Sequence, residues 1–366
     1  MTAVALEGSV VRKIWDHPLG KLSMGVIVFI AIVAILGYLI TPDPTPYANS
    51  MNLPLATKPP GTEADLLKIP LDVDHEETGW LTGWLTGSPS SYRTRVLTHW
   101  KVEGDHFFVQ DPKGKVVESI PLEKWGTNIS SDDFQGQFVE HRTYWLGTDK
   151  YGRDLLSRLI IGARISFSVG FIAVVISLLL GIPLGAYAGY FGGWVDSLIM
   201  WLVNVVWSIP TLLMVIALTL ALGKGFWQVF IAVGLTMWVE VARVIRGQVI
   251  SEKNKEYVEA GQVLGFTRSR IIWKHILPNV MAPLIVISAA NFASAILIES
   301  GLSFLGIGAQ PPMPSWGGMV KDHYPYLVMG KAYLAVIPGA CILILVLAFM
   351  TLGNVLRDVL DVRRAG

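Results

Sequence analysis

The sequence predicts an all-α polytopic membrane protein with six transmembrane helices and an external insert that contains α/β or β structure. The chain of 366 residues is 52% hydrophobic and only 16% charged, whereas a soluble domain carries about 25% charged residues. Apolar runs recur along the chain at roughly the 20-residue length that a spanning helix needs. One long interval, 41–146, is instead mixed and polar, which indicates a separate module outside the membrane.

The first apolar run, residues 22–40, predicts the first transmembrane helix. It carries no charged residue and follows Arg12, Lys13 and Lys21. Because basic residues favour the cytoplasmic side of a membrane, residues 1–21 are predicted to be a cytoplasmic N-terminus. A cleaved signal peptide is the alternative, but the run is long for one and no Ala-x-Ala site follows it.

The interval 41–146 is predicted to be an extracytoplasmic insert domain. It begins with TPDPTP, which cannot continue a helix, and HFFVQ-DPKG-KVVESI at 106–120 is typical of two strands around a turn. Such a long interval favours a folded domain over a plain loop. We expect this domain to dock an external receptor or a partner subunit.

The stretch 147–166 predicts an amphipathic helix along the outer membrane interface. Its apolar residues recur at helical spacing, among charged ones. The charged residues are Asp149, Arg153, Asp154, Arg158 and Arg164. Three arginines outside the membrane run against the positive-inside trend.

The transmembrane core is predicted over 167–355 and supplies helices two to six. These helices are expected at 167–188, 194–222, 226–245, 280–298 and 332–355. The connecting loop 246–279 and the tail 356–366 are rich in Lys and Arg, which places both of them, with the C-terminus, in the cytoplasm.

A short helix is predicted at 256–265, within the cytoplasmic loop. Tyr257, Ala260, Gly261 and Leu264 fall at i, i+3, i+4 and i+7, so they form one stripe whose small middle would let another surface approach closely. Gly265 fits a helix C-terminus, where a positive φ is often needed. From this pattern alone, an ordinary helix in a cytosolic loop is the alternative.

Four motifs in this sequence resemble those of a known family. Glu259-Ala260-Gly261, Gly265 and Leu277-Pro278 are similar to the EAA loop of ABC importer permeases, with Gly261 in place of an alanine and His275 in place of an isoleucine. The other motifs resemble the dipeptide/oligopeptide branch of that family, specifically its C-type subunit. They are LGTDKYGRDLLSRLIIGARIS (146–166), GYFGGWVD (189–196) and ESGLSFLGIGAQPPMPSWG (299–317).

The resemblance implies a type I (MetI-like) importer permease fold in the bacterial inner membrane, and a translocation subunit for di- or oligopeptides. It implies a homologous B-type permease, two ATP-binding subunits that hold ATP-Mg, and an extracytoplasmic solute-binding protein as partners. The coupling residues would be Tyr257, Glu259, Ala260, Gly261, Leu264, Gly265 and Pro278. The motif positions expected to be structural are Asp149, Gly152, Arg153, Asp154, Arg164, Gly193 and Asp196. Nickel chelates or other small solutes are the alternative substrates within the family.

Polar residues at membrane depth are the candidates for gating or for lining a pore. Glu240, near the inner end of its helix, could form an ion pair with Arg243 or serve as a gate. Glu299 could act in transport or pack against the turn that follows its helix. Asn204 and Asn291 could line a passage or bond across helices.

No catalytic residue, metal site or cofactor site is predicted in this chain. There is no Gly-x-x-x-x-Gly-Lys-Ser/Thr run and no His-Glu-x-x-His, and the net charge of +1 gives no bulk attraction to nucleic acid. Energy must then enter from another chain or from an ion gradient. A stand-alone secondary transporter and a membrane anchor for the insert are the other function classes considered, and the resemblance favours the importer permease.

Overall fold

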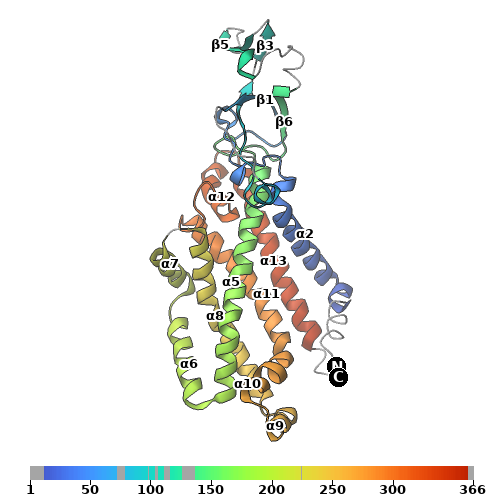
Figure 1. The fold of residues 1–366 in the computed structure, drawn as a ribbon, viewed down its shortest axis with the longest axis vertical. Coiled ribbons are helices and arrows are strands. Elements are labelled where there is room, and N and C mark those ends of the chain that lie inside the picture. Colours follow the sequence, from blue (N-terminus) through green and yellow to red (C-terminus); the bar gives the residue numbers. More distant parts are fainter. Residues whose placement is uncertain are drawn as a thin grey trace.

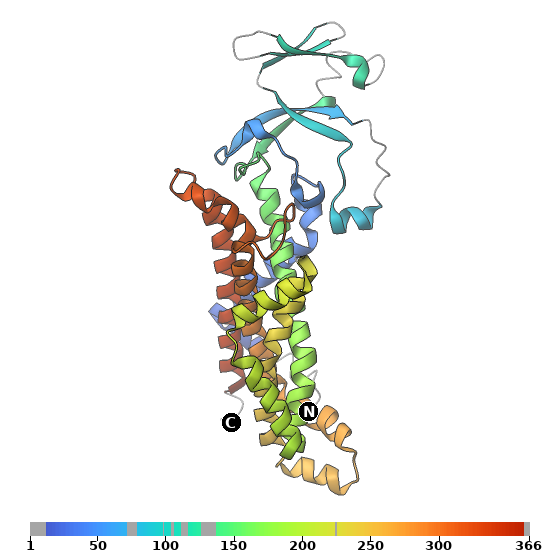
Figure 2. The same cartoon turned by 90° about the vertical axis from the view of Figure 1, so that its left-hand side faces the viewer.

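The computed structural model describes residues 12–71, 79–97, 99–103, 106–110, 116–125, 137–223 and 225–361. The molecule is elongated, with a helix bundle at one end and a β-rich insert at the other (Figures 1 and 2). The first eleven residues, the Asp111–Gly114 turn of the expected hairpin and residues 362–366 of the tail lie outside the described residues.

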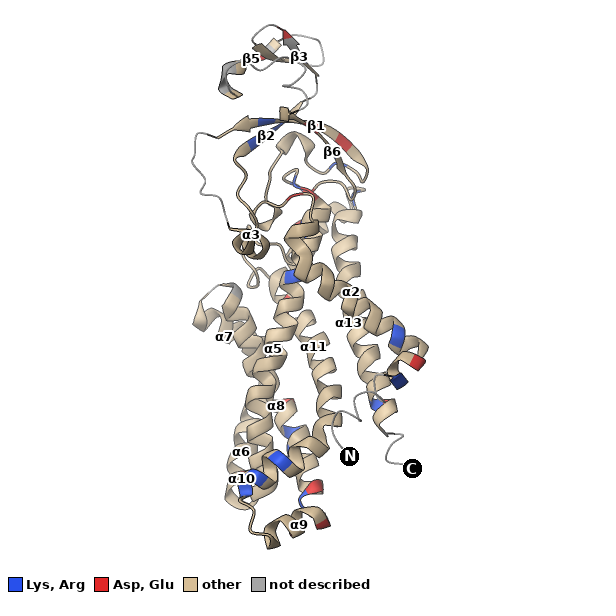
Figure 3. Ribbon diagram, turned by 45° about the vertical axis from the view of Figure 1, so that its right-hand side comes forward, with Lys and Arg blue, Asp and Glu red and all other residues tan. Residues whose placement is uncertain are grey.

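Within the described part of the chain, five helices or helical runs are long and apolar enough to span a membrane. A bent pair of helices makes a sixth crossing if it is counted as one span. The bundle contains α2 (Pro18–Ile40), α5 (Leu155–Phe191), α6 (Gly193–Trp207), α7 (Thr211–Leu222), α8 (Phe226–Glu252), α11 (Met281–Phe304) and α13 (Tyr333–Asp361). Charged residues gather toward its ends and are sparse between them (Figure 3). The predicted membrane fold is confirmed.

The expected interfacial helix over 147–166 is not a separate element. Residues from Leu155 onward are the first turns of α5, which continues without interruption to Phe191. Asp154 caps this helix, since its Oδ2 accepts a hydrogen bond from the Ser157 N–H at 2.8 Å. The apolar side chains of these turns, such as Leu155 and Ile161, are buried inside the molecule, so the helix enters the bundle directly.

The helix expected over 194–222 is broken into α6 and α7, which meet at 89°. Pro210 explains the break, because proline has no N–H to continue the helical ladder and disfavours helical geometry at the preceding residue. The segment 208–210 therefore separates two helices where the sequence predicted one.

Glycines let α5 approach α8 closely. A Cβ at Gly181 would lie 2.7 Å from the Trp238 carbonyl oxygen, and one at Gly185 would overlap the Ala242 carbonyl. Pro183 lies inside α5 without interrupting it, and Gly181 and Gly185 serve packing between the two backbones.

The insert folds as two three-stranded antiparallel sheets. The first has the order β2-β1-β6, with β1 (Thr62–Pro70) between β2 (Tyr92–Leu97) and β6 (Val139–Tyr144). The second has the order β3-β4-β5, formed by His99–Glu103, His106–Gln110 and Val116–Pro121. The pairing of β4 with β5 confirms the expected two strands, and a small apolar core that includes Leu67, Phe107 and Trp125 packs the sheets together.

A short helix, α3 (Trp80–Thr86), connects the insert to the C-terminal end of α2. The Trp84 indole Nε1–H donates to the Ile35 carbonyl at 2.7 Å. Arg164, a motif residue of α5, donates to the Trp84 carbonyl at 2.9 Å, and its guanidinium lies over the rings of Trp84 and Tyr38. Arg164 therefore links α5 to α3 of the insert.

A buried ionic cluster joins the insert to the bundle. Asp149 accepts hydrogen bonds from the backbone N–H of Arg153 at 3.0 Å and from its Nε at 2.6 Å, and Arg158 Nε lies 3.7 Å away. Arg153 Nη1 also reaches Asn49 Oδ1, in the chain that leaves α2, at 2.9 Å. At Gly152, where φ is +74°, a Cβ would overlap the Asn52 carbonyl, so only glycine fits this turn.

The end of the bundle nearest the insert is covered by α12 (Trp316–His323). This helix packs between α11 and α13, and Trp316 Nε1–H donates to the Leu159 carbonyl at 2.9 Å. Several core side chains of α5, α11 and α13 pack into one cluster with Trp316 and Met319.

Candidate coupling site

The helix expected at 256–265 is present as α9 (Glu256–Val263), at the end of the bundle opposite the insert (Figure 1). It is followed by α10 (Arg268–Arg270), a π-helical turn (Ile271–Ile276) and a 3₁₀ turn (Leu277–Val280) that lead into α11. The predicted loop is therefore mostly helical, and α9 connects the two long helices α8 and α11.

The start of α9 is fixed to the end of α8 through Glu252. This carboxylate accepts a hydrogen bond from the Tyr257 hydroxyl at 2.8 Å and pairs with Lys255 Nζ at 2.5 Å. Burial, with this hydrogen bond, raises the pKa of Tyr257 to about 12. The carboxylates of Glu256 and Glu259, in the first turn, also stabilise α9 by interacting with the positive end of the helix dipole.

The end of α9 has the hydrogen bonds of a Schellman motif. The N–H of Gly265 donates to the Gln262 carbonyl at 2.9 Å, and the N–H of Phe266 donates to the Gly261 carbonyl at 3.0 Å. Gly265 has a φ of +75°, which confirms the expected positive φ at this position.

The expected stripe on α9 is divided between two faces. Val258 and Gly261 are buried against the chain's own Phe266 and Ile271, and a Cβ at Gly261 would lie 3.3 Å from Phe266 Cδ2. Tyr257 is half-buried, whereas Ala260 and Leu264 are exposed. The prediction that Gly261 meets a partner's surface is therefore wrong, since Phe266 already covers it.

The exposed face of α9 consists of residues at i, i+3, i+4, i+7 and i+8. They are Glu256, Glu259, Ala260, Val263 and Leu264. Val263 is 88% exposed and Leu264 is 71% exposed. The exposed apolar side chains of Val263 and Leu264, beside two carboxylates, suit contact with another chain. Val263 was not among the residues predicted from the sequence.

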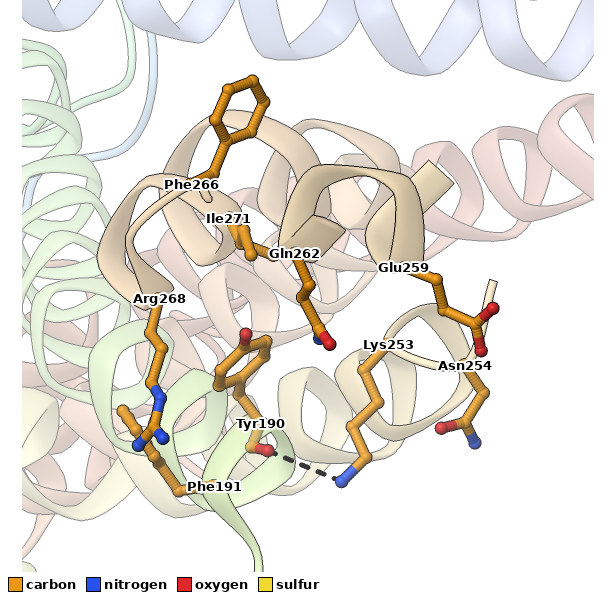
Figure 4. A pocket seen from close by; sticks show the side chains of 9 residues that line it. All are labelled: Tyr190, Phe191, Lys253, Asn254, Glu259, Gln262, Phe266, Arg268 and Ile271. Carbon is orange, nitrogen blue, oxygen red and sulfur yellow. Dashed lines mark hydrogen bonds between the residues drawn. The ribbon is translucent and has the colours of Figure 1, made fainter. Parts of the chain in front are cut away.

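A polar cleft of about 610 Å³ lies between α9 and the end of α5 (Figure 4). Lys253 Nζ donates to the Tyr190 carbonyl at 3.5 Å across the cleft, and the Arg268 guanidinium lies 5.7 Å from the centre of the Phe191 ring. Glu259 lines the same cleft.

Pro278 lies at the start of the 3₁₀ turn that leads into α11, with its side chain exposed. The unusual His275 of the EAA-like motif stacks on Phe266, with ring centroids 5.3 Å apart. The motif thus holds the Phe266 ring over α9 and links it to the base of α11.

Glu240 and Arg243 do not form the expected ion pair in the described structure. Arg243 Nη2 donates to Asn204 Oδ1 at 2.7 Å, and its guanidinium lies 3.4 Å from the centre of the Trp207 ring. Because α8 continues to Glu252, Glu240 lies near the middle of that helix and not near its inner end.

Glu299 and Asn291 are buried, and neither lines the cleft beside α9. Glu299 is 1% exposed, and its Oε1 accepts a hydrogen bond from Ser303 Oγ at 2.6 Å. Ser303 in turn contacts the following loop through the Ala309 N–H at 3.3 Å. This geometry favours the structural alternative for Glu299.

Asp196 lies in the first turn of α6, as expected, and also forms a bidentate pair with Arg246 of α8. The two N···O distances are 2.5 and 2.6 Å. Gly193, with a φ of +53°, belongs to the tight turn between α5 and α6. Both motif residues therefore fix the α5–α6–α8 corner.

The fold and this site define an integral membrane protein that presents a short, partly exposed helix at one end of an apolar bundle. Residues 181–366 match the family described as "Binding-protein-dependent transport system inner membrane component". The chain belongs to this family. The resemblance to dipeptide/oligopeptide permeases found in its motifs is confirmed by the relatives below.

Relatives with this similarity include an oligopeptide transport system permease protein of Bacillus subtilis, 41% identical over 60% of this chain and 72% of that protein. A glutathione transport system permease protein of Pectobacterium atrosepticum is 37% identical over 67% of this chain and 84% of that protein. A solved methionine ABC transporter in an inward-facing conformation aligns with 55% of this chain and 95% of its own, at 19% identity and a TM-score of 0.45.

Proposed function

We propose that this chain is the C-type translocation subunit of an ATP-driven importer of di- and oligopeptides. It would pair with a homologous B-type permease and receive substrate from an extracytoplasmic solute-binding protein. ATP-Mg would be held by two partner subunits, because this sequence has no phosphate-cradling motif. The similarity to peptide permeases supports the substrate class.

The orientation we propose has α9 and both chain ends in the cytoplasm of a bacterial cell, with the insert outside its inner membrane. Basic residues of the α8–α11 connection, such as Lys253, Arg268 and Arg270, support it. Ile14, before α2, packs against Val355 near the end of α13, which is consistent with an even number of crossings. The folded insert would then lie on the side where the solute-binding protein arrives.

The exposed face of α9 is the observation that carries this proposal. Closure of the ATPase subunits would push on Ala260, Val263 and Leu264. We expect α9 to move together with α8 and α11, because Tyr257 of α9 bonds to Glu252 of α8 and Val258 packs against the residues that lead into α11. Force on α9 would therefore move two long helices together, and ATP binding would bias the bundle between inward- and outward-facing states.

Ala260→Trp tests the docking of α9. Ala260 is exposed in this chain, so a large side chain there leaves the chain's own packing intact and clashes only with a docked partner. Overpacking at such a contact costs about 1–3 kcal/mol. We expect weaker co-purification of the ATPase subunits and loss of transport-coupled ATP hydrolysis.

Leu39→Trp is the control for this test, since Leu39 is exposed on α2, away from α9. It should retain both the co-purification of the ATPase subunits and the transport-coupled ATP hydrolysis. If Ala260→Trp also keeps them at wild-type levels, α9 is not the coupling element and a secondary transporter becomes the better proposal.

Substrate class is tested separately with the reconstituted complex and its receptor. Di- and oligopeptides should stimulate ATP hydrolysis more than glutathione or nickel chelates do. Stimulation by a nickel chelate alone would reassign the substrate and leave the permease function in place.

A further inference from the structure

The bend between α6 and α7 opens a cleft at membrane depth. The cleft has a volume of about 210 Å³ and is bounded by α6, α7, α8 and α11. Most of its lining residues are apolar, but the hydroxyl-bearing residues Thr211, Thr236 and Ser294 contribute from three different helices. Non-helical backbone at this depth is tolerated where it lines a cavity, and discontinuous helices in transporters commonly frame the substrate path.

Glu240 is the one ionisable residue in the lining of this cleft. It lies near the middle of α8, roughly 20 Å from either end at the helical rise of 1.5 Å per residue. Its side chain is exposed to the cleft, and within the described residues it has no ion pair or hydrogen bond.

The nearest cation along α8 is directed elsewhere. Arg243 is held by Asn204 and the Trp207 ring, so the negative charge of Glu240 is not compensated from its own helix. A carboxylate at membrane depth is costly unless it faces water or a partner, and such residues mark the routes of substrates and ions. The cleft therefore offers a fixed negative charge to a cation that passes through.

We propose that Glu240 binds the α-ammonium group of a peptide in transit through this cleft. This inference rests on the proposed peptide-import function. A charge-assisted hydrogen bond to the carboxylate would hold the peptide's amino end, and the Thr236 and Ser294 hydroxyls could bond to its first peptide group. No covalent step is involved, and release follows when the bundle switches state.

The test uses the complete complex in proteoliposomes with its receptor. Uptake of one peptide is compared with uptake of its N-acetylated form, each at a concentration that saturates the receptor. For each peptide, the uptake rate of the variant is divided by the uptake rate of the wild type. The selectivity of the receptor, which is unchanged, cancels in this ratio. Glu240→Gln should reduce uptake of the free-amine peptide about 10-fold or more and leave the acetylated peptide within about 2-fold, because a hydrogen bond to a charged group is worth about one tenfold step or more.

Two further variants make the result decisive. Glu240→Asp retains the charge and should keep the preference for the free amine. Glu299→Gln removes a carboxyl group that does not line the cleft, and should change uptake of both peptides by the same factor.

An equal loss for both peptides in Glu240→Gln overturns this inference while leaving the permease function intact. Loss of the second permease chain on purification of Glu240→Gln also overturns it, since the carboxylate would then pair with that chain. If the wild-type complex takes up neither peptide, the proposed function itself fails.

Discussion

Substitutions at Gly265 measure how much its backbone conformation contributes to the stability of the C-terminal turn of α9. Its φ of +75° lies in the left-handed region, and a Cβ added there meets no heavy atom within 4 Å. Substitution therefore acts through backbone conformation alone, at a cost of about 1–2 kcal/mol for an L-residue. We expect Gly265→Asn to be mildest, Gly265→Ala to be intermediate and Gly265→Val to be worst, because asparagine tolerates this conformation and β-branched residues avoid it.

The assay is hydrogen exchange of the Gly265 and Phe266 amides, which are bonded to the Gln262 and Gly261 carbonyls. A loss of about 1–2 kcal/mol in local opening free energy lowers protection roughly 5- to 30-fold. Transport-coupled ATP hydrolysis should fall in the same order across the three variants.

Gly247→Ala is the matched control. A Cβ at Gly247 also meets no heavy atom within 4 Å, but this glycine lies inside α8 and its φ is not positive. Alanine there should stabilise the helix by about 1 kcal/mol, the opposite sign to Gly265→Ala. Wild-type protection in Gly265→Val would refute the Schellman account of this turn.

The remaining predictions concern topology, the buried cluster and pH. After replacement of the native cysteine, a cysteine at Ser269 should be labelled only from the cytoplasm and one at Ser119 only from outside; labelling of both from one side contradicts the proposed orientation. Asp149→Asn should destabilise the purified protein by about 3–5 kcal/mol, measured by thermal unfolding, because it leaves buried arginines uncompensated. The hydrogen bond to a neighbouring aspartate raises the pKa of His141, so its contribution to stability is present below about pH 6.5 and is lost as pH rises through the raised value. His141→Gln should remove that part of the pH dependence of insert unfolding, and an unchanged profile would argue against it.

The apolar segments could be predicted because length and composition alone distinguish a membrane crossing. The positive φ of Gly265 could also be predicted, since it follows from where a helix must end. The break in 194–222 was missed although Pro210 was visible, because proline inside a membrane helix is often tolerated and only the surroundings decide between a kink and a break.

The orientation of α9 could not be predicted from spacing. A helical period groups Tyr257, Ala260, Gly261 and Leu264 together, but it does not say which edge of the group turns inward. That choice depends on Phe266, which folds back over Gly261, and on Ile271 of the following turn. Likewise, the i,i+3 spacing of Glu240 and Arg243 could not reveal that Trp207, on another helix, takes the guanidinium.

The pairing of β1 with β6 has a consequence for how this chain can be rebuilt. Thr62 and Tyr144 lie opposite each other in the sheet, so the polypeptide leaves for the distal part of the insert and comes back through adjacent backbone positions. A hairpin turn or a foreign domain whose own ends are close together can therefore be joined to β1 and β6. The exchange would also remove α3 and its hydrogen bonds to Ile35 of α2 and Arg164 of α5. Chimeras made at β1 and β6 would measure what the insert contributes to transport while leaving the sequence of the helix bundle unchanged.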